Sequence, residues 1–193
     1  MQNCRVPIAL AICCHLLAVD DASAQSAVLP EKAKVRILQS AAELLRDGSI
    51  TREQHVDLVH WVGARPCRNV QMRASTARLQ AVASAISKTE GFPNSHVLAY
   101  YAAAGWFVVY TDASAGDERY LLYRGDPASG IKSKLSWSGA ATMFETTEIR
   151  DWVVRDAPGV PRQLADCFAW QVTLGQQCRL TSRSSRLASA SRR

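Results

Sequence analysis

The sequence predicts an α+β fold, in which an N-terminal helical hairpin and a third helix are followed by an antiparallel β-meander and a C-terminal helix. Two observations lead to this prediction. Before residue 91, apolar residues recur at helical spacing, as they do along the buried side of a helix. After it, short runs rich in valine, tyrosine, leucine and phenylalanine are separated by glycine-containing turn signals, which is the pattern of consecutive antiparallel strands.

Residues 1–24 have the features of a secretory signal peptide. Arg5 gives a weakly basic start, residues 6–19 are an apolar run, and Ala22-Ser23-Ala24 supplies the small residues that a signal peptidase recognises. The alternative is a retained anchor or a lipoprotein, but the run of about 14 residues is shorter than the roughly 20 that a membrane-spanning helix needs. We expect cleavage before Gln25 and a secreted or periplasmic mature chain without a transmembrane segment.

A helical hairpin is expected in residues 25–65. Pro30 suits a first helical turn, and the apolar periodicity that follows ends at Asp47-Gly48. Thr51 is the expected N-cap of the second helix, with Gln54 three residues later as in a capping box. The sequence of residues 44–54, LLRDGSITREQ, resembles the short helical hairpins of SHOCT-type domains, which share the leucine pair, the glycine turn and the Ile-Thr start. The resemblance covers about thirty residues and implies the hairpin without implying an activity.

Residues 66–178 are expected to form an α+β domain with an antiparallel sheet. Residues 63–66 form a linker, and Ser75 or Thr76 caps a third helix that ends before Gly91-Phe92-Pro93. Strands are expected over residues 96–102, 106–112, 119–124 and 131–137, an extension of the sheet over residues 142–149 and 151–154, and a last helix over residues 162–172. The last of the sheet segments, residues 151–154, also fits a helix. A helix packed on one face of a meander is similar to cystatin-like folds, a likeness that implies no activity.

Three cysteines follow the predicted signal peptide: Cys67, Cys167 and Cys178. An exported protein with three cysteines is expected to hold one disulfide and one free thiol. We expect Cys167 to pair with Cys178, because a turn around Gly175 can close their short separation. Pairing of Cys67 with either of them remains the alternative.

Positive charge is concentrated at the C-terminal end of the sequence. The formal net charge of the whole chain is +6, and five arginines without any acid occupy the last fifteen residues. Serine is frequent there and large apolar residues are scarce, so residues 179–193 are expected to form a basic disordered tail. Such a tail either serves solubility alone or holds an anionic surface of lipid head groups, polysaccharide or nucleic acid.

Aromatic residues are concentrated in the predicted sheet. We expect Tyr101, Phe107, Tyr110 and Tyr123 to face outward as a binding surface, the alternative being that they fill the core. The sequence contains no Gly-x-Ser-x-Gly, no His-Glu-x-x-His and no phosphate-binding glycine loop. It therefore favours an exported binding or accessory protein, with an envelope protein or polysaccharide as partner and neither a cofactor nor a metal.

Three groups of residues remain candidates for catalysis or metal binding. Cys67 with His60 would make a thiol-dependent hydrolase, which is the alternative function. His55, Asp57 and His60 lie on the predicted second helix as a possible metal site, but the two histidines are about 140° apart around its axis, unlike the i, i+4 ligands of helix-borne zinc sites. Polar residues also gather at one predicted hairpin tip, where a solvated turn is the simpler interpretation. These residues are Asp112, Ser114, Asp117 and Glu118.

Overall fold

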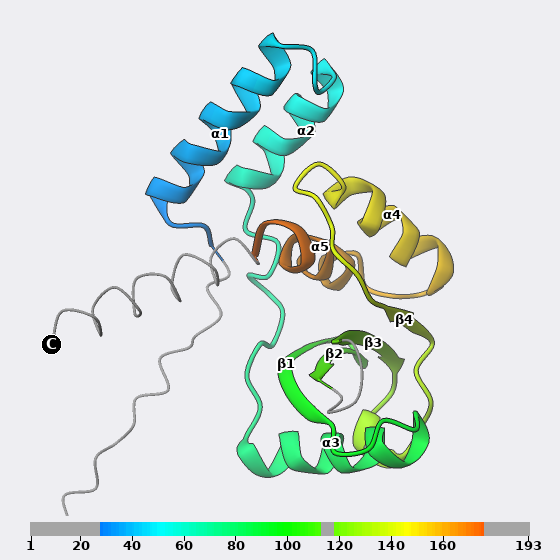
Figure 1. The fold of residues 1–193 in the computed structure, drawn as a ribbon. Helices are drawn as coiled ribbons and strands as arrows, with labels where there is room; N and C mark the ends of the chain where they lie inside the picture. The colour runs from blue at the N-terminus through cyan, green and yellow to red at the C-terminus, as the bar shows by residue number, and fades with distance from the viewer. Residues whose placement is uncertain (1–27, 113–117, 176–193) are drawn as a thin grey trace, which may run out of the picture.

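The computed structural model describes residues 28–112 and 118–175 of the 193-residue chain. The predicted signal peptide, Cys178 and the arginine-rich residues 179–193 lie outside the described residues. The described elements are α1 (Glu31–Arg46), α2 (Arg52–Gly63), α3 (Thr76–Thr89), β1 (His96–Ala103), β2 (Trp106–Asp112), β3 (Arg119–Arg124), the 3-10 turn η1 (Pro127–Ser129), β4 (Leu135–Trp137), α4 (Thr146–Asp156), α5 (Arg162–Trp170) and the π-helical turn η2 (Gln171–Gly175). These helices, with one four-stranded antiparallel sheet, confirm the predicted α+β fold (Figure 1).

The hairpin of α1 and α2 has the local signals that the sequence predicts. Gly48 takes a left-handed conformation, with a φ of 79°, in the turn that ends α1. Thr51 caps α2 through a capping box, in which its hydroxyl accepts a hydrogen bond from the Gln54 backbone at 3.2 Å and its own backbone donates to the Gln54 side chain at 2.9 Å. These bonds fix where α2 begins.

The sheet has the strand order β1-β2-β3-β4, and every neighbouring pair is antiparallel. Ala104 and Gly105 form the two-residue turn between β1 and β2, and both have positive φ, as tight hairpin turns that match the twist of a sheet require. An isolated bridge pairs Gln71 with Ala102, so the connection between α2 and α3 runs along the edge strand β1.

The segment after β4 differs from the sequence-based expectation. Residues 142–149 do not extend the sheet, because they belong to a loop and to the first turn of α4. The strand assignment of residues 151–154 is also wrong, and the helical alternative is confirmed. Ile149 and Val153 are buried, and their four-residue spacing puts them on one side of a helix. The last helix is shorter than expected, since α5 ends at Trp170 and continues as the π-helical turn.

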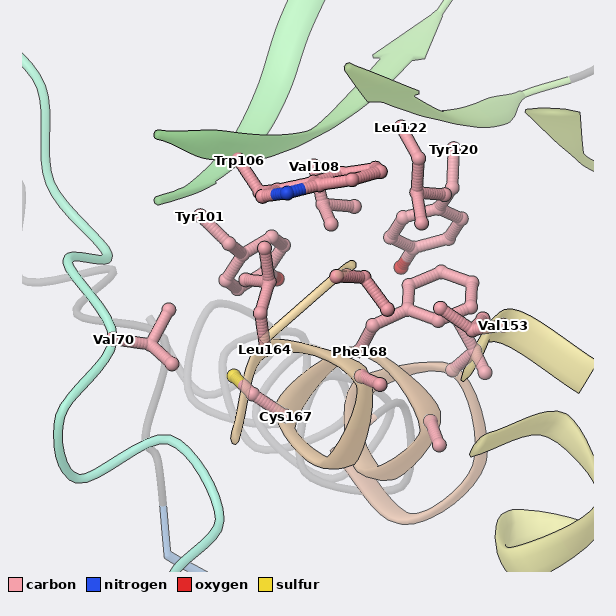
Figure 2. Packing of buried hydrophobic residues seen from close by; sticks show 14 of the residues in the cluster. Val70, Tyr101, Trp106, Val108, Tyr120, Leu122, Val153, Leu164, Cys167 and Phe168 are labelled. Carbon is pink, nitrogen blue, oxygen red and sulfur yellow. The ribbon is translucent and has the colours of Figure 1, made fainter. Parts of the chain in front are cut away.

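Helices cover both faces of the sheet (Figure 1). On one face, α3 packs through Val82 and Ile86. On the other, α5 packs through Leu164 and Phe168, and Figure 2 shows sheet side chains such as Tyr120 pointing toward this helix. Aromatic residues on both sides of the sheet are therefore part of the core.

A separate apolar cluster joins the hairpin to the C-terminal end of α5. Trp61 of α2 packs with Trp170 and Leu174 in this cluster. The Trp170 indole nitrogen also donates a hydrogen bond to the Trp61 carbonyl at 3.3 Å. The C-terminal half of α2 is therefore held against α5, and this position brings α2 beside α4.

Candidate functional site

A groove of about 1180 Å³ lies between α2 and α4. Val56 and His60 line it from α2, and Glu148 and Asp151 line it from α4. Phe144, in the loop before α4, contributes a further apolar side chain. Val56 has 60% of its surface exposed, so the groove presents an uncovered apolar side chain between charged walls.

Three side chains link the two walls of the groove. The Trp61 indole nitrogen donates a hydrogen bond to the Thr147 hydroxyl at 2.8 Å. The same hydroxyl donates to the Asp57 carboxylate at 2.7 Å. Because Trp61 and Asp57 belong to α2 and Thr147 to α4, this relay of two hydrogen bonds fixes the spacing of the walls.

Arg150 is a cation that lines the groove from α4. Its guanidinium lies 5.9 Å from the centre of the Trp61 ring and forms an ion pair with Asp151 at 2.7 Å. The hydrogen bond that Arg150 donates to Asp151 raises the pKa of Arg150, and the charges of Asp166 and Asp57 act in the same direction. The cation is therefore permanent, and most of its surface is covered by protein.

Asp166 of α5 is a poorly solvated carboxylate near this cation. Its Oδ1 atom is buried and has no hydrogen-bond partner within the described part of the chain. Burial raises the pKa of Asp166, while the positive charges of Arg150, Arg162 and His60 oppose the rise. This carboxylate could accept a hydrogen bond, or hold a proton more readily than an exposed one. Within residues 28–112 and 118–175, no group of three or more His, Cys, Asp or Glu is placed to hold a metal ion.

The structure corrects the predicted disulfide. Cys167 pairs with Cys67, so the expected pairing of Cys167 with Cys178 is wrong. The two half-cystines are 100 residues apart in sequence, but their Cα atoms are 4.6 Å apart, because the segment after α2 runs back along α5. Proximity in sequence is a weak guide here, since the fold brings together a linker and the last helix.

The disulfide also removes the thiol on which the alternative function depends. The Cys67 sulfur is bonded to Cys167, and the residue is buried, so no thiolate is available as a nucleophile. His60 remains exposed on α2, where its ring contacts Trp61 and it lines the groove. The proposed pairing of Cys67 with His60 for catalysis is therefore wrong in the disulfide-bonded protein.

The predicted aromatic binding surface is mostly buried. Tyr101, Tyr110 and Tyr123 belong to the core, so their outward orientation is wrong. Phe107 is partly buried and packs at 5.9 Å from the ring of Tyr100. Alternation along the strands does send these side chains to opposite faces, but helices cover both faces. The nearly uninterrupted apolar run over residues 106–110 was the available signal, because a strand with one solvated face alternates apolar and polar residues.

Tyr110 also lines a smaller hollow of about 530 Å³ beside the end of the sheet. Tyr120 stacks on Tyr110 with a ring separation of 4.2 Å, and Trp137 lies next to it. Glu118, from the predicted polar hairpin tip, is a further lining residue. Ser114 and Asp117, which belong to the same predicted tip, lie outside the described residues.

Most of the residues that line the groove were not predicted from the sequence. Of the predicted candidates, Asp57 and His60 line it, and Thr147 and Arg150 were not anticipated. Assigning residues 142–149 to a strand hid their relation, because Thr147 and Arg150, three residues apart, share one side only when the segment is helical.

The comparisons with known proteins give no family for this chain. No family model matches it, and neither a curated protein nor a solved structure does. Among the helices that the structure describes, none is long and apolar enough to cross a membrane. The functional interpretation therefore depends on the geometry of the groove and on the sequence.

Proposed function

We propose that the protein is an exported binding or accessory protein, secreted or periplasmic, which captures a segment of an envelope protein in the groove between α2 and α4. The export part of the proposal depends on the signal-peptide features of residues 1–24. The binding part depends on the groove, in place of the sheet face favoured by the sequence.

The observation that carries the binding function is the exposure of Val56 within a preformed groove. An apolar centre, here Val56 with Phe144, inside a charged rim is the usual anatomy of a protein-binding surface. The hydrogen bonds through Thr147 hold both walls in place before a partner arrives. A preformed site loses less conformational entropy on binding.

Capture of the partner is tested by substituting Val56 with aspartate. The matched control is Val35→Asp, because Val35 is also the fifth residue of its helix and is 53% exposed, but does not line the groove. A photo-crosslinking residue placed at position 56 should trap one envelope protein that the same residue at position 35 does not. In the intact protein, Val56→Asp should abolish its co-purification and Val35→Asp should leave it. Equal capture by both variants, with unchanged melting temperatures, would refute the groove as the binding surface.

Export is tested separately, by the mass and location of the chain in cells. We expect the protein in the periplasm or medium to begin at Gln25. Replacing Ala24 by tyrosine should leave an uncleaved precursor, because a signal peptidase requires a small residue there. A full-length chain that stays in the cytoplasm would contradict export while leaving the groove untouched.

A further inference from the structure

The chemistry of the groove indicates what kind of segment fills it, and this inference rests on the proposed function. Its walls are helices of 12 and 11 residues, so they are roughly 16 to 18 Å long at about 1.5 Å per residue. Its volume of about 1180 Å³ exceeds the roughly 300 to 1,000 Å³ of common small-molecule pockets. This size suits about three turns of a third helix.

The walls also distinguish a helical occupant from an extended one. An extended peptide gains affinity chiefly by main-chain hydrogen bonds to a free sheet edge. Along α2 and α4, the backbone groups already bond within their own helices, apart from the terminal turns. An occupant of the groove must therefore satisfy its own backbone, which a helix does, and it must offer an apolar face to Val56 and Phe144.

Some of the charged side chains that line the groove form ion pairs, and others do not. Arg150 and Arg155 already pair with Asp151 and Asp156. By contrast, Glu53 on α2 and Glu148 on α4 form no ion pair with any described residue. Of the arginines that line the groove, Arg52 alone forms no ion pair with a described residue. The Asp57 carboxylate accepts a hydrogen bond from Thr147.

Each wall thus carries an exposed carboxylate that has no ion pair among the described residues. Hydrogen bonds from its own backbone and from Thr51 lower the pKa of Glu53, which keeps it ionised at neutral pH. Exposed ion pairs at an interface rim add little affinity but select partners by charge and speed their encounter.

We propose that the partner segment is a basic amphipathic helix, which lies between α2 and α4 with its apolar face on Val56 and Phe144 and with lysine or arginine on both flanks, facing Glu53 and Glu148. The assignment follows from helical walls, an uncovered apolar side chain and an unpaired carboxylate on each side.

Three synthetic peptides of about 18 residues, long enough to span the walls, test this assignment. The first has a leucine stripe at helical spacing with lysine flanks, the second the same stripe with glutamate flanks, and the third the lysine composition with the stripe scrambled. Binding of each labelled peptide to the intact protein is measured by fluorescence anisotropy at low and high salt. We expect the lysine-flanked helix to bind about tenfold tighter than the glutamate-flanked one, a difference that salt weakens. The scrambled peptide should not bind.

A charge exchange in the protein makes the test specific. The double substitution Glu53→Lys and Glu148→Lys should reverse the preference between the two helical peptides. The control, Glu31→Lys with Glu43→Lys, changes net charge equally on α1, away from the groove, and should keep the original preference. Equal binding of both helical peptides, or a preference that survives the exchange, would overturn the charge assignment.

Failure of this inference can be distinguished from failure of the proposed function. If no peptide binds while Val56→Asp still abolishes capture of the envelope protein, the helical occupant is wrong and the groove remains the binding surface. If Val56→Asp changes neither the capture of the envelope protein nor the binding of the peptides, both the groove and its helical occupant are wrong. Sedimentation tests whether a second copy of the chain fills the groove instead. If the wild type is a dimer that Val56→Asp dissociates and Val35→Asp does not, the second copy is the occupant and the partner helix is wrong.

Discussion

Single side chains decide how the two walls of the groove are joined. The Thr147 hydroxyl uses both of its hydrogen-bonding roles at once, since it accepts from the Trp61 indole and donates to the Asp57 carboxylate. Neither wall could move far without leaving a half-buried polar group unsatisfied. The relay therefore couples the stability of the fold to the shape of the groove.

Replacing Thr147 by valine, which has nearly the same shape, should destabilise the protein. The substitution leaves the Trp61 donor and one Asp57 acceptor without their partner, and such a loss costs about 1 to 3 kcal/mol of the free energy of unfolding. Urea denaturation measures this cost. Thr147→Ser keeps the hydroxyl and should recover most of it, so an equal loss in both variants would show that the methyl group matters and the relay does not.

Substitution of Asp166 should stabilise the protein at neutral pH, in contrast to the loss of stability expected for Thr147→Val. Because burial raises its pKa in the folded protein, the charged form is disfavoured by folding, and this residue contributes less to stability as pH rises through its folded pKa. Asp166→Asn removes the charge. The change that it causes in the free energy of unfolding should therefore be more favourable at pH 7 than below about pH 4, the usual pKa of an exposed aspartate.

The measurement for Asp166 is urea unfolding of both proteins across that pH range. Glu148→Gln, which removes an exposed carboxylate from α4, is the control and should change little. A loss of stability at pH 7 in Asp166→Asn would mean that the attraction of Arg150 and Arg162 outweighs the desolvation of the carboxylate.

At the scale of elements, polar contacts attach α3 to the turn after β3. Arg78 of α3 forms two hydrogen bonds with the Asp126 carboxylate, at 2.9 and 2.6 Å. Asp126 also accepts from the Ala128 backbone and so caps η1. The Arg78 guanidinium lies near the rings of Tyr100 and Phe107 as well, so it covers the edge of the core beneath α3.

The contribution of this contact should depend on pH. The hydrogen bonds from Arg78 lower the pKa of Asp126, so its stabilisation is present above the usual aspartate pKa of about 4 and is lost as pH falls through the folded value. Asp126→Asn keeps an acceptor for Ala128 but loses the charge. Since the pair is partly exposed, we expect the variant to lose less than about 1 kcal/mol at pH 7 and progressively less as pH falls below about 4.

Thermal or urea unfolding at several pH values tests the Asp126 prediction. In an Arg78→Gln background the substitution Asp126→Asn should have almost no effect at any pH. A pH-independent difference, or one that persists without Arg78, would show that the ion pair is not its cause.

Elements with strong local signals could be predicted from the sequence, and elements defined by their surroundings could not. The Thr51 capping box and the turn at Gly48 act within a few residues, so the hairpin was predictable. The segment that becomes α4 was not, because a short apolar pattern such as Ile149 with Val153 fits a strand or a helix until its neighbours are known. That one ambiguity concealed the second wall of the groove.

At the scale of the whole molecule, the fold depends on contacts between segments far apart in sequence. The sheet is covered on both faces, and the hairpin packs on the end of α5 through Trp61 and Trp170. Composition and periodicity predict the class of elements but not which faces become covered. This is why the aromatic residues were predictable as strand residues and not as core residues, and why the cysteine pairing was wrong.

The disulfide between Cys67 and Cys167 is the longest-range covalent constraint among the described residues, and its removal should lower stability more than any other change considered above. It closes a loop of about 100 residues that includes α3 and the whole sheet, so it restricts the unfolded chain strongly. We expect the double variant Cys67→Ala and Cys167→Ala to lose roughly 2 to 4 kcal/mol of unfolding free energy. Urea unfolding of the oxidised protein, the reduced protein and the variant measures it.

Cys178→Ala is the matched control for the disulfide, because it removes a cysteine that takes no part in the bond with Cys167. The control should unfold like the wild type, and peptide mapping without reduction should recover Cys67 joined to Cys167. If Cys178→Ala is the destabilised variant instead, the bond in solution closes the short C-terminal loop. The position of α2 beside α4, on which the groove depends, would then rest on the apolar cluster around Trp61 and Trp170 and on the hydrogen bonds through Thr147.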